Sequence, residues 1–360
     1  MRLTPLRDQR PCFCGIICIF NSIMRPSADE TALFFRQIPS KSLVVSGEST
    51  SGVKTLKIRI TLLPACSLKR EKLDPVFIGN SENPRGFRGS KLSSLGVVYY
   101  WNKKAWMTSK IFSDWLNRIN NKFKLQSRRV LLFVDNCSAH GNIDLSNIKV
   151  QFLPKNTTSK LQPCDAGIIQ NVKLNYRKMF LRHLISKLDN DRTATTQQVA
   201  KSITLLDAII WNRVSWLRVQ EDTITKCFRK CGFGQCDVTN SPEVIKFEDD
   251  MVDHPILTGV NVEEYVNCDA NEQTSSNVQD VPVVGDEQEE ENVEDIELND
   301  SDDEFINSQT AILYVNHLLK YACKHNNGIL INHFIKASSE LCNVKLNDLK
   351  QPTIFKYFKP

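Results

Sequence analysis

The sequence predicts a mixed α/β domain over residues 25–190, and three observations support this prediction. Short apolar runs bounded by Pro or Gly have the length of strands. Two longer segments carry apolar residues at helical spacing. Hydrophobic residues make up 41% of the 360 residues and include 18 Phe, which is enough to fill a core.

Six apolar runs are expected to form strands. Most are bounded by turn-forming residues, and the later ones are apolar throughout, as buried strands are. In chain order they are TALFFR (31–36), GVKTLKIRITLL (52–63), DPVFIG (74–79), GVVYYW (96–101), VLLFV (130–134) and IKVQFLP (148–154).

Helices are predicted over residues 108–123 and 165–188. The first has an apolar face that includes Phe112 and Trp115, and Thr108 is a suitable N-cap. The second is apolar on one side, and we expect Lys173 and Arg177 to lie exposed on the other side and contact DNA.

Residues 191–240 are predicted to be a helical extension of this domain. Trp211, Trp216 and Phe228 would anchor it, and the helical pattern ends at Gly232. A helix-turn-helix is the alternative reading, but no residue distinguishes it.

Charge is distributed unevenly along the chain. The segment Phe247–Glu304 holds 21 of the 41 acidic residues and no Lys or Arg, so the rest of the chain has a net charge of +26. A region this basic favours a polyanionic partner, with DNA as the leading candidate, although a solubilising surface is the alternative. Residues 241–305 are expected to be a disordered acidic linker because they are highly charged and poor in large apolar residues.

The ends of the chain are interpreted separately. Residues 1–24 form an atypical leader, with a basic start and an apolar run that resembles a signal peptide but lacks a clear cleavage site. Residues 306–349 are predicted to be a small helical segment. No run is long enough to span a membrane. The 12 cysteines show no zinc-binding or disulfide spacing, which favours reduced thiols inside the cell.

Three acidic residues stand at the ends of predicted elements. Asp29 precedes the first strand, Asp135 ends the strand VLLFV, and Asp165 begins the second helix. Carboxylate oxygens are the ligands that Mg²⁺ prefers, and carboxylates converging from strand ends and a helix start could hold it. The alternative is that Asp165 is only a helix cap and that Asp29 with Glu30 is surface charge.

Four sequence stretches together resemble one known family. They are ADETALFFRQIPSKSL, NKKAWMTSKIFSDWLNRIN, LLFVDNCSAHG and VQFLPKNTTSKLQPCDAGIIQNVKLNYRK. These stretches are similar to the DDE superfamily of Tigger, pogo and jerky-type transposases and the host proteins derived from them, and the resemblance covers about residues 28–236.

The resemblance implies an RNase H-like fold, a mixed sheet flanked by helices. It implies that Asp29, Asp135 and Asp165 bind Mg²⁺ or Mn²⁺ and catalyse cleavage and joining of DNA strands. It also implies nuclear location. Further DNA contacts are expected from exposed or loop residues on this framework, namely Lys103, Lys104, His140 and Lys160. For His140, orienting the second acid or a hydrogen-bonded loop role are alternatives.

The sequence also departs from the family pattern. The apolar segment expected before the first acid is replaced by MRPSADE, where Pro26 removes a strand donor. The stretch PACSLKREK lacks the usual glycine, and no paired helix-turn-helix domain precedes Asp29. These departures predict a damaged first strand, and they leave catalysis less certain than the fold.

The tail, residues 350–360, carries a second signal. Its sequence QPTIFKYF resembles the peptide that docks on the DNA sliding clamp, proliferating cell nuclear antigen, through an aliphatic and two aromatic anchors. Docking of the tail on its own helical segment is the alternative. The anchors would be Gln351, Ile354, Tyr357 and Phe358.

The sequence therefore predicts a transposase-derived nuclear protein that binds DNA through an RNase H-like domain. Two alternatives remain open: an active Mg²⁺-dependent transposase or endonuclease, and a non-enzymatic interaction protein tethered to the sliding clamp.

Overall fold

The structure is a computed structural model that describes seven ranges of the chain and some helical residues between positions 314 and 337. Residues 1–23 of the predicted leader and the clamp-docking residues Gln351, Ile354, Tyr357 and Phe358 lie outside the described residues. The seven ranges are 24–39, 58–87, 92–141, 143–154, 157–191, 193–233 and 260–275.

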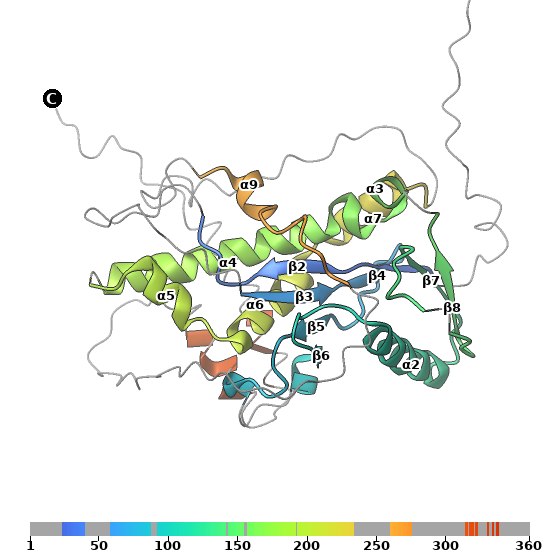
Figure 1. The fold of residues 1–360 in the computed structure, drawn as a ribbon, viewed down its shortest axis with the longest axis horizontal. Coiled ribbons are helices and arrows are strands. Elements are labelled where there is room, and N and C mark those ends of the chain that lie inside the picture. The colour runs from blue at the N-terminus through green and yellow to red at the C-terminus, as the bar shows by residue number, and fades with distance from the viewer. Residues whose placement is uncertain are drawn as a thin grey trace, which may run out of the picture.

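Two four-stranded sheets form the centre of the fold, in the orders β4-β1-β7-β8 and β2-β3-β5-β6 (Figure 1). Helices flank them, so the predicted mixed α/β class is confirmed, and the arrangement agrees with an RNase H-like core. The strands are β1 (Pro26–Ala28), β2 (Thr31–Phe34), β3 (Arg59–Leu63), β4 (Ala65–Ser67), β5 (Val76–Gly79), β6 (Val98–Trp101), β7 (Val130–Val134) and β8 (Ile148–Phe152).

One pair of chain segments contributes to both sheets. Strands β1 and β2 follow each other with only Asp29 and Glu30 between them, and β3 and β4 are separated only by Pro64. The two segments pair antiparallel throughout, β1 with β4 and β2 with β3. The two sheets therefore separate at Asp29 and Glu30. Strand β1, before these residues, pairs with β7, whereas β2, after them, belongs to the sheet of β3 and β5.

Strand β1 forms although its first residue is Pro26. All three residues are buried, and β1 pairs with β4 on one side and β7 on the other. The expectation that Pro26 would damage this strand is wrong, because proline is tolerated at the first position of a strand, where its missing N–H disrupts the ladder least.

The hairpin between β4 and Leu73 also forms without its expected glycine. Arg70 takes the left-handed conformation, with φ of 68°, and its N–H donates to the Ser67 carbonyl at 2.8 Å. A non-glycine residue pays about 1–2 kcal/mol for this conformation. The pairing of the hairpin ends offsets that cost, including the 2.8 Å bond from Leu73 N–H to the Ala65 carbonyl.

Both predicted helices of the domain are present. The first begins where its Thr108 hydroxyl accepts from the Ile111 N–H, which confirms the predicted N-cap. The second is preceded by a π-helical turn, so α4 proper starts later than predicted. The helices are η1 (Arg85–Phe87), η2 (Leu92–Leu95), α2 (Ser109–Leu125), α3 (Thr158–Leu161), η3 (Cys164–Ile168), α4 (Ile169–Asn190), α5 (Thr196–Ser202), α6 (Leu205–Arg218), α7 (Glu221–Lys230) and α9 (Val262–Val266).

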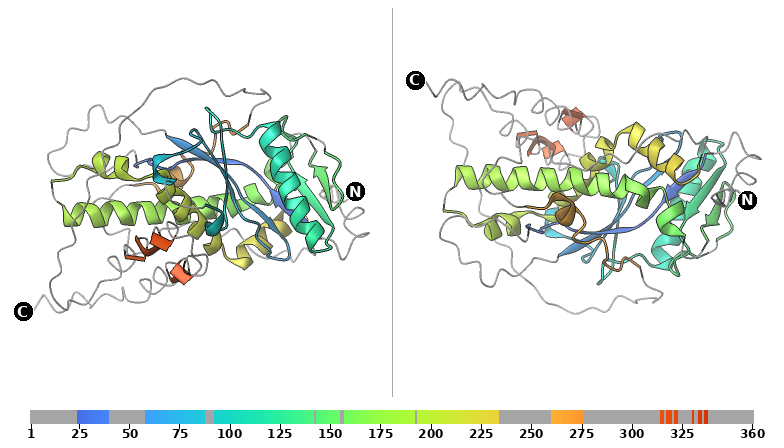
Figure 2. Two further views of the ribbon diagram at one scale, coloured as in Figure 1. Left: turned by 90° about the horizontal axis from the view of Figure 1, so that it is seen from below. Right: turned by 90° about the horizontal axis from the view of Figure 1, so that it is seen from above.

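The two faces of β7 point into two separate core clusters. Leu131 and Phe133 join the cluster that contains the buried faces of α4 and α6, whereas Leu132 and Val134 join the cluster under α2. Figure 2 shows α4 along the length of the molecule and α2 at the end that holds β7 and β8. Trp211, Trp216 and Phe228 are buried in the first cluster, so the predicted anchors of the helical extension are confirmed.

Lys173 and Arg177 do not face solvent. Both are buried on α4, where they pair with Asp269, the Arg177 Nη2 to Asp269 Oδ2 distance being 2.7 Å. Asp269 Oδ2 also accepts from the Phe34 N–H at 3.0 Å, and Arg177 Nη1 donates to the Phe34 carbonyl at 2.7 Å. The prediction that Lys173 and Arg177 contact DNA is therefore wrong, because α4 uses them to bind a distant segment of its own chain.

That segment, residues 260–275, belongs to the stretch that was expected to be an acidic linker. It contains α9, whose Tyr265 hydroxyl donates to the Gln37 carbonyl at 2.7 Å. Further along, the Met107 N–H donates to the Thr274 carbonyl at 2.7 Å. Residues 260–275 are thus part of the folded domain, because the buried side chains of Lys173 and Arg177 bind the carboxylate of Asp269. No helix among the described residues is long and apolar enough to cross a membrane.

Asp269→Asn is expected to destabilise the fold by about 3–5 kcal/mol, because it leaves two buried cations without their counter-charge. Chemical denaturation of the full chain measures this directly. Asp144→Asn, at an exposed position, is the matched control and should change stability by about 0.5 kcal/mol or less. Equal stability of the two variants would contradict the role assigned to Asp269.

Candidate metal centre

Asp29 and Asp135 are brought together by parallel strand pairing. Ser27 of β1 lies opposite Phe133 of β7. Each acid comes two residues later in its strand, and the carboxyl ends of parallel strands lie at the same edge of a sheet. One carboxylate oxygen from each of Asp29, Glu30 and Asp135 lies within 4.8 Å of the others.

Asp165 reaches the same place from the start of η3. The Gln162 side chain is fully buried and donates to the Ala28 carbonyl at 2.9 Å, and the Cys164 thiol donates to the Ser27 carbonyl at 3.6 Å. Both bonds fix η3 to β1 directly before Asp29, and Asp165 shares a hydrogen bond with Asp29. The three acids named from the sequence therefore converge.

Gly167 permits the turn that directs Asp165 inward. Its φ is 145°, and a Cβ at this position would meet the Cys227 sulfur of α7 at 3.3 Å. Glycine adopts such a conformation without strain, whereas other residues do so rarely. The sequence QPCDAG thus encodes both the attachment to β1 and the bend after the acid.

Burial and neighbouring carboxylates raise the pKa of two of the acids, Asp29 and Asp165. Burial raises the pKa of Asp29 well above its usual range, and the charges of Asp165 and Glu30 raise it further. Burial also raises the pKa of Asp165; the hydrogen bond from Asp29 lowers it, and the charge of Asp135 raises it. In the absence of a cation, burial and the neighbouring carboxylates therefore favour the protonated form of Asp29.

His140 connects the second acid to the first strand segment. Its Nε2 lies 2.8 Å from Glu30 Oε1, and its Nδ1 lies 2.8 Å from Asp135 Oδ1. The ring stacks on Phe112 at 4.3 Å between centroids. Burial alone would lower the pKa of His140, but the carboxylates of Glu30 and Asp135 outweigh it and raise this pKa to about 11.

The structure corrects two sequence interpretations here. His140 is buried, so it holds Asp135 in place and does not contact DNA. The Glu30 side chain is only 3% exposed, so the alternative of surface charge is wrong. Sequence reasoning missed the pairing of Glu30 with His140; the only signal for it was the position of both residues beside proposed acids.

The donor set fits a hard divalent cation. Asp135 Oδ1 is buried and makes no hydrogen bond; its close partner is the His140 ring at 2.8 Å, an ion pair, while the ring Nδ1 is hydrogen-bonded to the Asp135 backbone oxygen at 3.2 Å. Buried carboxylate oxygens need a hydrogen-bond donor or a metal ion, and Mg²⁺ or Mn²⁺ binds such oxygens. Asp29 and Asp135 would hold the ion together with Asp165.

The remaining predicted DNA contacts are on the surface. Lys103 and Lys104 are exposed between β6 and α2, with the Lys104 ammonium 4.8 Å from the centre of the Trp106 ring. Lys160 is exposed on α3, shortly before Asp165. These three lysines stay predicted DNA contacts.

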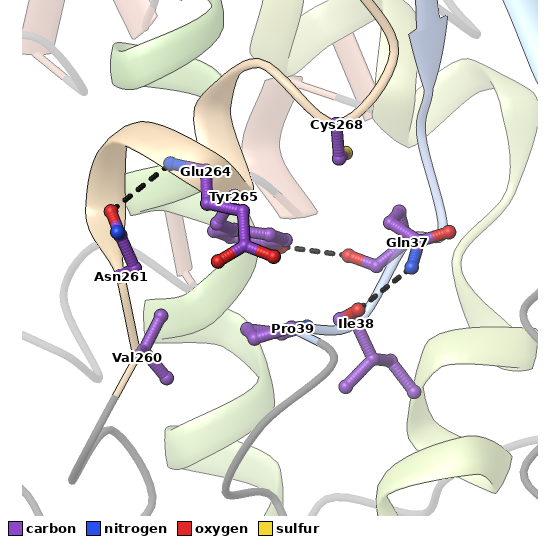
Figure 3. A pocket seen from close by; sticks show the side chains of 8 residues that line it. All are labelled: Gln37, Ile38, Pro39, Val260, Asn261, Glu264, Tyr265 and Cys268. Carbon is purple, nitrogen blue, oxygen red and sulfur yellow. Dashed lines mark hydrogen bonds between the residues drawn. The ribbon is translucent and has the colours of Figure 1, made fainter.

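A separate pocket lies between α9 and the segment after β2 (Figure 3). Its wall includes the Tyr265–Gln37 hydrogen bond. None of the clustered acids lines it, so it is distinct from the candidate metal centre. The lining residues are Gln37, Ile38, Pro39, Val260, Asn261, Glu264, Tyr265 and Cys268.

Asp29→Asn is expected to stabilise the metal-free protein, and more so at pH 8 than at pH 5. The raised pKa of Asp29 makes folding unfavourable wherever the unfolded chain has ionised this group, from about pH 4 upward. The cost therefore grows as pH rises towards the folded-state pKa, and the amide of Asn removes it. In thermal unfolding with a chelator present, the melting temperature of Asp29→Asn should exceed that of the wild type by about 2–4 °C for each kcal/mol of stabilisation. Asp144→Asn is the control, and a lower melting temperature for Asp29→Asn at pH 8 would contradict this account.

Comparison with known proteins identifies the domain. Residues 57–228 match the DDE superfamily endonuclease family. This range contains Asp135 and Asp165 and begins after Asp29. No solved structure matches the chain.

Three curated relatives illustrate the range of similarity. Tigger transposable element-derived protein 4 of Mus musculus is 32% identical over 257 residues, which cover 68% of this chain and 48% of that protein. ARS-binding protein 1 of Schizosaccharomyces pombe is 29% identical over 245 residues, 63% of this chain and 44% of that protein. Major centromere autoantigen B of Homo sapiens is 27% identical over 210 residues, 58% and 33% of the two chains.

The chain spans half or less of the length of these three relatives. The matched domain contains two of the converging acids, and the sequence similarity extends to the Tigger and Jerky proteins. The chain therefore belongs to the DDE superfamily endonuclease family, as a transposase-derived protein of the Tigger and Jerky type.

Proposed function

We propose that this chain binds DNA and that its acid cluster holds Mg²⁺ or Mn²⁺ for the cleavage of DNA strands. The observation that carries the proposal is that carboxylate oxygens of Asp29 and Asp135 lie within 4.8 Å of each other, with Asp165 close enough to raise the pKa of Asp29. Strand β1, on which Asp29 depends, is fully buried and paired on both sides, and this supports a competent site.

Each residue of the cluster has a defined part in this proposal. A bound divalent cation activates water and stabilises the charge that develops on the phosphate. Asp29, Asp135 and Asp165 bind and orient the cation. His140 fixes the rotamer of Asp135, and Glu30 fixes His140 through the 2.8 Å contact at Nε2.

DNA is proposed as the partner on the basis of charge and relatives. Outside Phe247–Glu304 the chain has a net charge of +26. Two relatives are named for centromeres and for binding an ARS element. These names also support nuclear location as a proposal. Lys103, Lys104 and Lys160 are the exposed side chains that we propose contact phosphates.

The full chain is expected to nick supercoiled plasmid when Mg²⁺ or Mn²⁺ is present. Asp135→Ala should lower the nicking rate about 100-fold or more, because the cation then loses a shared ligand. Asp144→Ala is the matched control and should nick at the wild-type rate.

Two results would count against cleavage as the function. Nicking that persists in Asp135→Ala would assign it to a contaminant. Absence of nicking in every protein, with DNA binding retained, would favour the alternative of a non-enzymatic DNA-binding protein. The clamp-docking role of Gln351, Ile354, Tyr357 and Phe358 belongs to that alternative and stays a prediction from the tail sequence.

DNA affinity is expected to fall steeply with salt concentration. Each lost phosphate contact lowers the slope of log affinity against log salt by about 0.9. Lys160→Ala should produce this change in a fluorescence anisotropy titration. Lys201→Ala, an exposed lysine on α5, should leave the slope unchanged. Equal slopes for wild type and Lys160→Ala would remove Lys160 from the proposed interface.

A further inference from the structure

The loop after β7 carries a second set of possible metal ligands that includes sulfur. Asp135, Cys137 and His140 follow each other in the sequence DNCSAH. One ligand atom from each, an oxygen, a sulfur and a nitrogen, lies within 4.8 Å of the other two. No spacing of paired cysteines and histidines predicts this site, because a single tight turn supplies all three residues.

His140 is oriented as metal-binding histidines usually are. Its Nδ1 faces Asp135 Oδ1 at 2.8 Å, and its Nε2 is 2.8 Å from Glu30 Oε1. A histidine that binds a metal through one nitrogen almost always donates its other N–H to a carboxylate or a carbonyl, which fixes the ring. Stacking on Phe112, with 29° between the rings, holds the imidazole in the same orientation.

Cys137 is fixed in the turn by two hydrogen bonds. Its thiol donates to the Ser275 hydroxyl oxygen at 2.9 Å, and its sulfur accepts from the Ala139 N–H at 3.5 Å. These bonds hold the sulfur beside the Asp135 carboxylate and the His140 ring. Ser275 belongs to the folded part of the acidic stretch, so this contact also connects that segment to the metal centre.

We propose that Asp135, Cys137 and His140 form a site for Zn²⁺ that is chemically distinct from the Mg²⁺ site. Zn²⁺ binds thiolate, imidazole and carboxylate in tetrahedral sites, whereas Mg²⁺ requires oxygen ligands. Three protein ligands leave the fourth position for water or a phosphate oxygen.

When Zn²⁺ binds at this site, Asp135 is one of its ligands and is no longer available to the Mg²⁺ site of Asp29, Asp135 and Asp165. Bound Zn²⁺ therefore excludes Mg²⁺ or Mn²⁺ and inhibits strand cleavage. This consequence rests on the proposed function, but Zn²⁺ binding does not, so the test uses binding alone.

Cobalt titration of the full chain under reducing conditions tests the site, because Co²⁺ replaces Zn²⁺ and is coloured. We expect a thiolate-to-cobalt charge-transfer band in the near ultraviolet and the visible bands of tetrahedral cobalt, both removed by one equivalent of Zn²⁺. Cys137→Ser should abolish the charge-transfer band. Cys268→Ser, which changes an exposed thiol away from this loop, should retain it.

Two further variants separate the two metal sites. Asp165→Asn should retain the cobalt spectrum, because Asp165 is not one of the three ligands. Glu30→Gln should weaken cobalt affinity about 10–100-fold, as loss of a histidine's supporting carboxylate does.

An unchanged charge-transfer band in folded Cys137→Ser would overturn the proposal, because cobalt would then be bound by other cysteines. Thermal unfolding of the metal-free variants establishes that they are folded. If Cys137→Ser does not fold, Glu30→Gln decides the question, and wild-type cobalt affinity in that variant would overturn the proposal.

Discussion

The parallel pairing of β1 with β7 is the contact on which the site depends. Ser27 opposite Phe133 sets the register, and this register brings Asp29 and Asp135 to one edge. A shift of one residue would turn each carboxylate to the opposite face of its strand. The buried bond from Gln162 to the Ala28 carbonyl uses the same strand to place η3, so all three acids take their positions from three residues of β1.

Without a bound cation, burial of several carboxylates close together makes this arrangement of acids electrostatically unfavourable. Burial, followed by the charges of Asp165 and Glu30, raises the pKa of Asp29, and the cationic imidazole of His140 compensates part of the negative charge. A divalent cation would provide the missing positive charge. At Asp269 the balance of charge is reversed, because one buried carboxylate pairs with two buried cations. The fold thus contains one site that is complete and one that needs a ligand.

Local signals in the sequence predicted six of the eight described strands, the N-cap at Thr108 and the three acids, but not β1 or β4. They did not predict which charged residues are paired across long separations. Asp269 is 92 residues from Arg177, and Glu30 is 110 residues from His140. For that reason the sequence alone predicts DNA contacts at Lys173, Arg177 and His140, all of which are buried. Pro26 and the missing glycine at Arg70 predicted damage. Pairing of β1 on both sides preserves the first strand, and the backbone bonds of the hairpin offset the cost of about 1–2 kcal/mol at Arg70.

The central claim is that Asp29, Asp135 and Asp165 bind one divalent-cation centre. A crystal structure of the full chain grown with Mn²⁺, with data collected to show anomalous scattering, tests it most directly. The account predicts an anomalous peak at about 2.0–2.2 Å from carboxylate oxygens of Asp29 and Asp135, with Asp165 at the same centre. A peak bound elsewhere, or Asp29 still hydrogen-bonded to Asp165 with no peak between the acids at saturating Mn²⁺, would contradict it.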